Sequence, residues 1–438
     1  MPISIKLDRR SALKTAAAAA LPAWFVRELR AEQEPPKLAE KPKIALIGCG
    51  GRGRGDAAEA SKYGTVVAVC DVDSSHVAAA AKQFNGAKSY SDFRKLLDME
   101  KGVSAIVNGT PDHWHTLVNL ASLKAGKDVY SEKPLTLTID EGKRVVAAVK
   151  ESGRVLQTGS QQRSDPRFRL ACEIVRNGRL GKLTRVNTIL PQGLTAGPFK
   201  AAPIPKELDW EFWQGQAPAH EFVPERGHFS FRYWSEYSGG TLTDWGAHHN
   251  DIALWGLGLD RSGPVSAEGK LLTKPVPGGY TAPAAYEIEF TYANGVVHNC
   301  LSTTASGVTG GPAKGKPGDQ PHGVKFEGPD GWLFVTRGKI EASKPEILND
   351  KFSDKESRLP VVNDHMGNFF DCIRTRKAPI CDAEIGHRSA SLCHLAGIAV
   401  RLGRKLNWDP VKEQFADDKE ANALVAREQR KPWSYETI

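Results

Sequence analysis

The chain has 438 residues, 40% of them hydrophobic and 25% charged, a composition typical of a folded globular protein with more than one domain. The 59 basic and 51 acidic residues give a net charge of +8, and both signs are spread along the chain, which argues against a nucleic-acid-binding protein. The seven cysteines are never spaced C-x-x-C, so neither a disulfide framework nor a zinc site is expected.

The N-terminal segment, residues 1–42, differs from the rest of the chain. Arg9 and Arg10 precede a weakly apolar run over residues 15–26, and a polar stretch rich in Glu, Lys and Pro follows. This order resembles a twin-arginine export signal with a linker, and it predicts a periplasmic or otherwise exported protein. A chance Arg-Arg pair before an alanine-rich helix is the alternative, and it would leave the protein in the cytoplasm. No other apolar run approaches the roughly 20 residues of a membrane-spanning helix, so no membrane insertion is expected after signal removal.

A strand, a glycine turn and a helix follow the linker. The apolar run over residues 43–48 leads into G-C-G-G-R-G at residues 48–53 and a helical pattern over residues 56–62. A second buried strand over residues 65–71 ends in an acid, Asp71, near the interval expected for a dinucleotide site. The glycine turn alone is weak, but together with this acid it predicts dinucleotide binding.

Each residue of this motif has a separate physical task. Gly48 allows the tight turn, Gly50 lets the backbone approach a pyrophosphate, and Gly53 lets the helix pack close to the strand. Asp71 favours NAD over NADP, because its carboxylate accepts hydrogen bonds from ribose hydroxyls and repels a 2′-phosphate; Arg52 and Arg54 nearby weaken this preference. The residues predicted to hold the cofactor here are Gly48, Gly50, Gly51, Arg52, Gly53 and Asp71.

Strands and helices then alternate as far as residue 160. We expect helices over residues 75–84, 93–99, 115–125 and 139–151, and strands over residues 103–108, 128–130 and 155–158. Alternation at this spacing predicts an α/β Rossmann domain, a doubly wound parallel sheet, over residues 43–160.

The pattern changes in residues 161–438. A helix is expected over residues 167–177, a strand over 183–189, and hairpins over 285–301 and 323–336. Helical periodicity returns over residues 363–402 and predicts helices that pack back on the assembly. The sequence therefore predicts an α+β C-terminal domain with a large, mostly antiparallel open sheet.

Two loops that follow predicted strands carry polar side chains. T-P-D-H-W-H occupies residues 110–115 and S-E-K-P occupies residues 131–134. Ligands of a doubly wound sheet lie beyond the carboxyl ends of its strands, so both loops face the expected pocket. The proline after Lys133 keeps that residue out of helical conformation, and a cis Lys133–Pro134 bond is compatible with the sequence. We therefore expect the amine of Lys133 to be aimed at the nicotinamide end of the pocket.

The stretch D-W-G-A-H-H-N-D at residues 244–251 offers four possible metal ligands. In a helix, steps of ~100° per residue place Asp244, His248 and Asp251 within an arc of ~60° and turn His249 ~100° away from His248. Adjacent helical histidines do not converge on one ion, so no metal site is predicted. Asp251 is predicted to contact and position the catalytic residues without taking part in catalysis itself.

These motifs together resemble the Gfo/Idh/MocA oxidoreductase family over nearly the whole chain after the signal. G-C-G-G-R-G, T-P-D-H-W-H, E-K-P and G-G-T-L-T-D-W-G-A-H-H-N-D-I-A-L-W occur in the family's order. The resemblance implies that Lys133, Asp244 and His248 form the catalytic set and, by analogy, that the protein is a homo-oligomer, a dimer or tetramer. The further residues expected to line the cofactor pocket are Thr110, Pro111, His115, Glu132 and Lys133.

Hydride transfer from a secondary alcohol needs a base for the hydroxyl proton. We assign His248 as this base, Lys133 as its partner on the reacting oxygen, and Asp244 as the orienting residue or substrate anchor. Lys133 is the alternative base if burial lowers its pKa, and a helix-cap pair of Asp244 and His248 is the structural alternative.

Aromatic residues are dense between residues 210 and 237, with Arg226 and Arg232 among them. Rings and guanidinium groups suit a carbohydrate substrate, although core packing or a subunit interface explains them equally well. The residues expected to contact the substrate are Arg163, Arg232, Tyr233, Trp234 and His249.

Export constrains the function, because free NAD is scarce outside the cytoplasm. The sequence therefore predicts an oxidoreductase that acts on a secondary hydroxyl of a sugar and keeps a tightly bound NAD that it recycles. One alternative is an NAD-dependent glycoside hydrolase working by transient oxidation and elimination, although the H-G-L-G-P stretch of one such exported group is missing. Another is a nucleotide-bound sensor or scaffold, against which the presence of Lys133, Asp244 and His248 together argues.

Overall fold

The computed structural model describes residues 21–22, 24–26, 41–303 and 322–438. Arg9, Arg10 and the polar linker over residues 27–40 lie outside this set. Within it, no helix combines the length and the apolar character needed to cross a membrane. Phe25, in the segment assigned to the signal, is buried in the core of the second domain with its ring 4.7 Å from the guanidinium carbon of Arg169.

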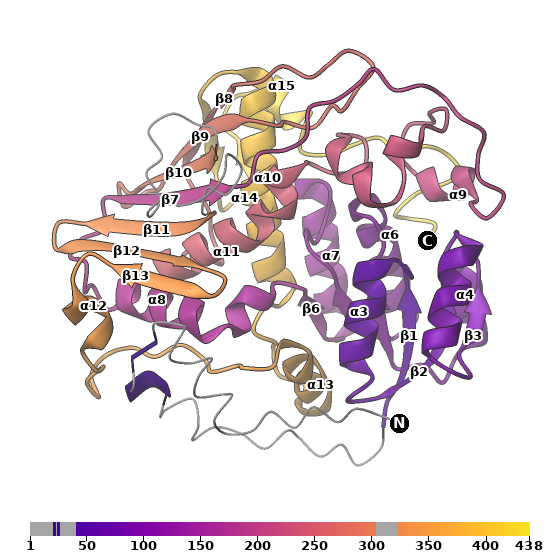
Figure 1. Ribbon diagram of the computed structural model, residues 1–438, viewed down its shortest axis with the longest axis horizontal. Coiled ribbons are helices and arrows are strands. Elements are labelled where there is room, and N and C mark those ends of the chain that lie inside the picture. The colour runs from indigo at the N-terminus through magenta and orange to yellow at the C-terminus, as the bar shows by residue number, and fades with distance from the viewer. Residues whose placement is uncertain (1–20, 23, 27–40, 304–321) are drawn as a thin grey trace.

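The first domain is built on a six-stranded parallel sheet with the strand order β3-β2-β1-β4-β5-β6 (Figure 1). Its inner strands are buried on both faces because apolar clusters under the helices cover the two sides, whereas the edge strand β3 is largely exposed. This confirms the predicted doubly wound sheet, with β3 as a short strand that the sequence analysis did not identify. The strands are β1 Lys43–Ile47, β2 Thr65–Cys70, β3 Lys88–Tyr90, β4 Ala105–Asn108, β5 Asp128–Ser131 and β6 Leu156–Thr158, and the helices are α3 Gly51–Ala60, α4 Ser74–Gln83, α5 Phe93–Met99, α6 Asp112–Lys124 and α7 Ile139–Ser152.

The second domain is built on a nine-stranded sheet with the order β13-β12-β11-β7-β10-β9-β8-β14-β15. All neighbouring strands run antiparallel except β7 and β10, which confirms the mostly antiparallel sheet. The strands are β7 Arg185–Leu190, β8 Ser266–Leu271, β9 Tyr286–Thr291, β10 Val297–Ser302, β11 Gly323–Gly328, β12 Gly331–Thr336, β13 Lys339–Ala342, β14 Leu406–Asp409 and β15 Gln414–Phe415.

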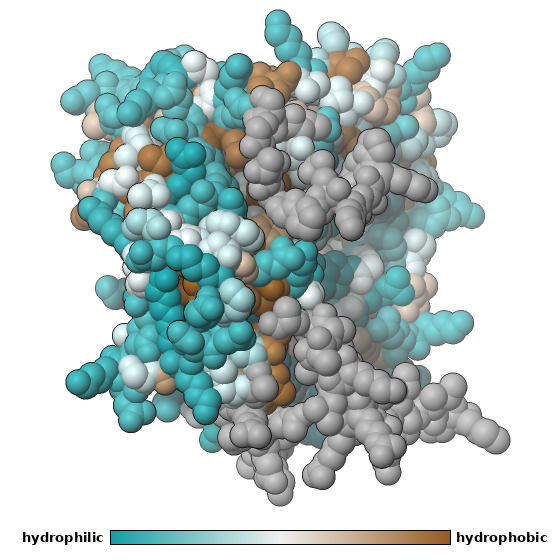
Figure 2. Space-filling model, turned by 60° about the vertical axis from the view of Figure 1, so that its left-hand side comes forward, coloured by the Kyte–Doolittle hydropathy of each residue, from teal (hydrophilic) through white to brown (hydrophobic). Residues whose placement is uncertain are grey.

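Three helices pack on one face of this second sheet, as Figure 1 shows. They are α8 Pro166–Arg176, α11 Gly246–Leu257 and α14 Ala383–Leu402. Their apolar residues form the largest core of the molecule with the inward residues of the strands. α14 also contacts α7, and α13, His365–Thr375, contacts α3, so chain from beyond residue 360 packs on the first domain. The surface in Figure 2 is mostly hydrophilic, with apolar residues in small areas, as expected from the mixed charge.

Between the sheets, short helices shape the region around the domain junction. They are η1 Gln161–Ser164, α9 Trp210–Gln214, η2 Pro224–Arg226, η3 His228–Tyr233 and α10 Thr241–Asp244. Two further short helices, α12 Pro345–Asn349 and α15 Lys419–Asn422, lie instead against the edge strands β13 and β15 of the second sheet. The single residue Trp245 separates α10 from α11 and itself has right-handed helical angles. The helical phase assumed for residues 244–251 is therefore shared by two helices, α10 and α11, that follow each other with almost no break.

The glycine turn brings α3 into direct contact with the end of β1. A Cβ atom at Gly53 would lie 2.0 Å from the backbone oxygen of Gly48 and 3.4 Å from the Cα of Gly109. Gly48 itself has φ 89°, a left-handed conformation that favours glycine. The close packing role predicted for Gly53 is thus a contact between backbones.

Arg163 is a core residue, and the expectation that it contacts the substrate is wrong. Its side chain is 1% exposed, and its guanidinium donates twice at 2.8 Å to Asp251 and once at 3.0 Å to Asp260. Asp251 also accepts from the hydroxyl of Ser389 at 2.6 Å, so it joins η1, α11 and α14 instead of supporting the catalytic residues as predicted. Each of the three guanidinium nitrogens of Arg163 already donates to a carboxylate, and the buried side chain is not part of the cavity wall.

We expect Gly53→Ala to destabilise the protein by about 1–3 kcal/mol, because the new methyl group overlaps backbone atoms that cannot rotate away. Gly55→Ala, in the same helix, is the matched control: its Cβ would meet nothing within 4 Å. Alanine there should stabilise by up to about 1 kcal/mol through helix propensity. Chemical denaturation of both variants checks this, and equal effects would contradict the contact between Gly48 and Gly53.

Asp251→Ala should destabilise the fold by about 3–5 kcal/mol, since it leaves the buried Arg163 without its bidentate partner. Asp260→Ala removes a partly exposed partner and keeps the fork between Arg163 and Asp251, so a much smaller loss is expected. The midpoint of urea unfolding measures both. A loss no greater for Asp251→Ala than for Asp260→Ala would show that Arg163 is not anchored as described.

Candidate active site

A cavity of about 690 Å³ lies at the carboxyl ends of the parallel strands, where the second domain closes over them. Gly53 is not part of its wall and packs beneath the turn instead. Arg232 and Asp244 contribute from the second domain. The wall contains all the other residues predicted to hold the cofactor, namely Gly48, Gly50, Gly51, Arg52, Asp71, Thr110, Pro111, His115, Glu132 and Lys133.

Asp71 is fixed at the end of β2 by backbone donors. The amide of Cys49 donates to its Oδ2 at 2.6 Å and the amide of Asp73 donates to its Oδ1 at 2.9 Å. These bonds come from the glycine turn and from the start of α4, so the carboxylate is held in the cavity wall in one orientation. It lies where the ribose hydroxyls of a dinucleotide are bound in this fold.

Arg52 is held by two carboxylates at the first turn of α3. Its Nε lies 3.0 Å from Glu132 and its Nη2 lies 2.5 Å from Asp56. Burial raises the pKa of Glu132, but the charges of Arg52 and Lys133 outweigh burial and leave that pKa below its ordinary value. Burial, and then the charge of Glu132, raises the pKa of Asp56 well above its ordinary value. The network fixes the loop after β5 against the glycine turn.

Lys133 joins the two domains at the wall of the cavity. Its peptide bond to Pro134 is cis, and its amine donates to the carboxylate of Asp244 and, at 3.0 Å, to the backbone oxygen of the same residue. Burial raises the pKa of Asp244, but the charges of Lys133 and then Arg232 outweigh it and hold that pKa below its ordinary value. The structure therefore brings two of the three predicted catalytic residues into an ion pair.

His248, the third, lies in the first turn of α11 and is 5% exposed. It is outside the cavity wall but within electrostatic reach of Lys133. Burial, followed by the charges of Lys133 and Arg337, holds the pKa of His248 well below its ordinary value. Its Nδ1 has no hydrogen-bond partner among the described residues. A neutral imidazole with an unengaged nitrogen is the form that can accept a proton.

His249 faces a different group, as the helical phase predicts. Its ring stacks on Trp245 with centroids 5.7 Å apart, and its Nε2 lies 2.8 Å from Nδ1 of His322. The guanidinium carbon of Arg337 lies 4.8 Å from the centroid of the Trp245 ring. Arg337 and His322 were missed by sequence reasoning, because they lie in β-hairpin and loop segments with no motif of their own. A substrate contact by His249 stays a prediction.

Of the remaining residues expected to contact the substrate, Arg232 alone lines the cavity, with its Nε 3.8 Å from Asp244. Trp234 is 3% exposed, lies under the guanidinium of Arg226 and donates its ring N–H to a backbone oxygen at 2.7 Å. The expectation for Trp234 is therefore wrong, because the ring belongs to a separate apolar core. Tyr233 packs against Tyr280 outside the wall, and its substrate contact stays a prediction.

Asp112, within the T-P-D-H-W-H loop, is a buried carboxyl in the wall to which no role was assigned. It accepts a hydrogen bond from the hydroxyl of Ser238 at 2.5 Å, and burial raises its pKa. The only sequence signal was its place after a strand, since Ser238 lies more than a hundred residues away. This bond is a second link between the two domains.

The cavity fits NAD on structural grounds. A Cβ at Gly50 or Gly51 would point into open space at the N-terminus of α3, where amide groups favour a pyrophosphate. The carboxylate of Asp71 follows β2, and Lys133 follows β5, which lies on the other side of the central strands β1 and β4. Gly50, Gly51 and Asp71 would hold the dinucleotide, and Lys133 would lie beside its reacting end.

Comparison with known proteins finds inositol and levoglucosan dehydrogenases among the relatives of this chain. Scyllo-inositol 2-dehydrogenase (NAD(+)) of Bacillus subtilis (strain 168) is 26% identical over 296 residues, 64% of this chain and 70% of that protein. Inositol 2-dehydrogenase 2 of Saccharopolyspora erythraea is 35% identical over 150 residues, 33% of this chain and 44% of that protein. Levoglucosan dehydrogenase of Pseudarthrobacter phenanthrenivorans is 30% identical over 135 residues, 31% of this chain and 33% of that protein. The matches to the last two span less than half of those proteins.

Solved structures share the fold. The WlbA dehydrogenase from Bordetella pertussis, in complex with NADH and UDP-GlcNAcA, superposes with a TM-score of 0.62 at 19% identity, covering 84% of this chain and 99% of that one. Levoglucosan dehydrogenase in complex with NADH and levoglucosan gives a TM-score of 0.63 at 18% identity, with 84% and 99% covered.

Both domains match families of known description. Residues 42–160 match "Oxidoreductase family, NAD-binding Rossmann fold" and residues 193–435 match "Oxidoreductase family, C-terminal alpha/beta domain". Since the two matches cover most of the sequence and the cavity between the domains fits the dinucleotide, the chain belongs to the Gfo/Idh/MocA family of NAD-dependent oxidoreductases.

Proposed function

We propose that the protein oxidises a secondary hydroxyl of a sugar or polyol, outside the cytoplasm and with a tightly held NAD. The proposal rests on the ion pair of Lys133 and Asp244 in the cavity wall. The charge of Lys133 acts on the nearby His248 and helps to keep its imidazole neutral. Relatives that act on inositol and levoglucosan support a ring-bound secondary alcohol as the reacting group.

The residues divide the reaction between them. NAD, when bound, supplies the hydride acceptor. Lys133 donates a hydrogen bond to the reacting hydroxyl oxygen and stabilises the negative charge that develops on it. His248 takes the hydroxyl proton, because burial and neighbouring cations keep its imidazole uncharged. Asp244 holds the Lys133 amine in place and thereby fixes where the oxygen must lie.

Retention of the cofactor is the second part of the proposal. The wall of the cavity comes from both domains, so a nucleotide within it is enclosed by segments far apart in sequence. Such enclosure suits an enzyme that carries its NAD out of the cytoplasm and restores it with a second substrate. The open face of the nine-stranded sheet is, in the same proposal, where copies of the chain meet in a dimer or tetramer.

Lys133→Ala and His248→Ala should each lower kcat by at least about 100-fold, since each removes a group acting on the transferred proton or its oxygen. Inositols, levoglucosan and common monosaccharides serve as substrates, and absorbance of reduced cofactor is the readout. Lys124→Ala and His220→Ala, away from the cavity wall, are the controls. Unchanged activity in either site variant would reject this assignment. Release of an aglycone from aryl glycosides without net reduced cofactor would identify the hydrolase instead.

Purified protein should carry close to one NAD per chain through gel filtration, measured by mass spectrometry after denaturation. A cofactor-free preparation that binds NAD only weakly would refute the recycling part of the proposal.

Replacement of Arg9 and Arg10 by lysine should keep the protein in the cytoplasmic fraction, because a twin-arginine signal depends on both guanidinium groups. Export that persists in this double variant would refute the signal.

A further inference from the structure

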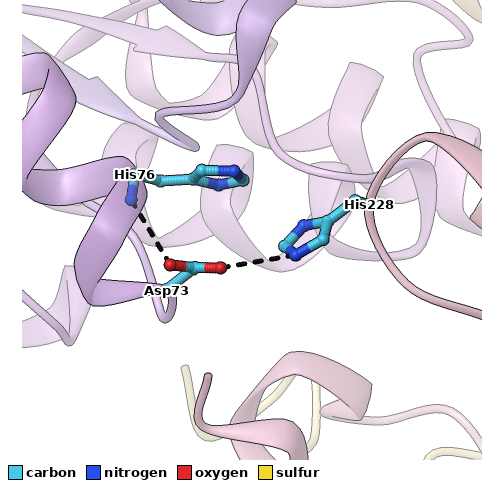
Figure 3. A group of neighbouring side chains, drawn as sticks. All are labelled: Asp73, His76 and His228. Atoms are coloured by element: carbon cyan, nitrogen blue, oxygen red, sulfur yellow. Dashed lines mark hydrogen bonds and ion pairs between the residues drawn. The ribbon is translucent and has the colours of Figure 1, made fainter. Parts of the chain in front are cut away.

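Three side chains from the two domains converge at one end of the cofactor cavity. Asp73 and His76 come from the start of α4, and His228 begins η3 in the second domain (Figure 3). One ligand atom from each lies within 4.8 Å of the other two, and Oδ2 of Asp73 is 3.3 Å from Nε2 of His228. The two imidazole rings are 4.8 Å apart. We propose that Asp73, His76 and His228 bind a divalent transition-metal ion that fastens the segment carrying His228 to the nucleotide domain.

The carboxylate of Asp73 is oriented before any ion binds. Its Oδ1 accepts from the amide and hydroxyl of Ser75, at 2.8 and 2.5 Å, and from the amide of His76 at 3.3 Å, as the N-cap of α4. Those bonds use one oxygen. The other, Oδ2, points toward His228, as Figure 3 shows. A capping carboxylate of this kind can serve as a one-oxygen ligand without loss of its helix contacts.

His76 has a carboxylate beside one of its ring nitrogens, as metal-binding histidines commonly have. Its Nδ1 lies 3.5 Å from Oδ2 of Asp71, the carboxylate held by the glycine turn. A carboxylate that accepts from one ring nitrogen fixes the tautomer and makes the other nitrogen a better ligand. Among the described residues nothing is hydrogen-bonded to Nε2 of His76, so that atom is free for an ion.

His228 occupies its place at a conformational cost. Its φ is 46°, in the left-handed region that residues other than glycine rarely adopt and that costs of order 1 kcal/mol or more. The conformation brings its imidazole to Asp73 across the boundary between the domains. A bond from this imidazole to an ion would offset the cost.

The ligand set defines the class of ion. Two imidazoles and one carboxylate suit Zn²⁺, Co²⁺ or Ni²⁺ and do not suit Mg²⁺ or Ca²⁺, which prefer oxygen ligands. Ligands at about 2.0–2.1 Å from a tetrahedral ion stand about 3.3 Å apart. The separation of Asp73 and His228 already has this value, and His76 needs only to move closer. A water molecule completes the fourth position.

The site acts on the cofactor cavity because its residues form part of that wall. Asp71, His76, His228 and the following Phe229 all line the cavity. An ion between α4 and His228 therefore ties the covering segment across the ribose end of the cofactor. We infer that the bound ion slows release of NAD.

The test measures Zn²⁺ binding to the full chain, stripped with a chelator, by competition with a chromophoric chelator at pH 7.5. We expect one tight site per chain. His228→Ala and Asp73→Asn should weaken it by about 100-fold or more, since even the outer partners of metal ligands account for about 10–100-fold. Asparagine caps a helix as well as aspartate, so Asp73→Asn keeps α4 intact. His220→Ala is the control, because this imidazole also lies beside a carboxylate, 3.2 Å from Glu236, but outside the cluster.

Equal Zn²⁺ affinity in the wild type, His228→Ala and Asp73→Asn would overturn the site and indicate only adventitious binding. Anomalous diffraction at the zinc edge, with a peak between the three side chains, would support it. Stopped-flow release of NAD supplies the second readout: Zn²⁺ should slow release in the wild type and in His220→Ala but not in His228→Ala. Release that is unaffected by Zn²⁺ in the wild type would overturn the fastening. None of these measurements depends on sugar oxidation.

Discussion

The contact on which the site depends is the ion pair between Lys133 and Asp244, because it is made by two domains that share no sheet. Lys133 is positioned by a loop after β5, and Asp244 ends a four-residue helix that leads into α11. Each side chain is held where it is by the other. The electrostatic state of the neighbouring His248 follows from this arrangement, since the Lys133 charge acts on a buried imidazole.

Carboxylates and cations form a connected system around this pair. Arg52, Glu132 and Asp56 connect the glycine turn with the loop that carries Lys133. Lys133 in turn reaches the second domain through Asp244, and Asp112 reaches it through Ser238. Ion pairs and charged hydrogen bonds therefore fix the side chains of the cavity wall around Lys133. At the glycine turn, contacts between backbone atoms fix the wall instead.

The sequence predicted those features of the structure that depend on interactions between residues close together in the chain. The glycine turn, the acid after β2 and the phase of His248 against His249 depend on residues close in sequence, and the structure agrees with them. Short strands without a clear pattern, such as β3 with the residues K-S-Y and β8 with S-A-E-G-K-L, were missed. Pairing with neighbouring strands, which no local pattern records, decides these elements.

Errors among the site residues have the same origin. Arg163 and Trp234 look like ligand contacts in sequence, but their partners, Asp251 and Arg226, determine that they are buried structural groups. Arg337, His322 and His228 approach the site from distant segments and have no motif. A titratable side chain can be recognised from sequence, whereas the burial and charge around it depend on the whole fold.

The packing of α13 has a consequence for how the chain is made. Met366, Phe369 and Phe370 belong to the apolar cluster that covers one face of the first sheet, together with Ile44 and Leu46 of β1. α3 and α4 cover part of this face, and the rest stays uncovered during synthesis until α13, more than 200 residues beyond the end of β6, has been added. The first domain is continuous in its sheet but not in its core. Complete burial of this face therefore requires the chain to have been synthesised as far as residue 370.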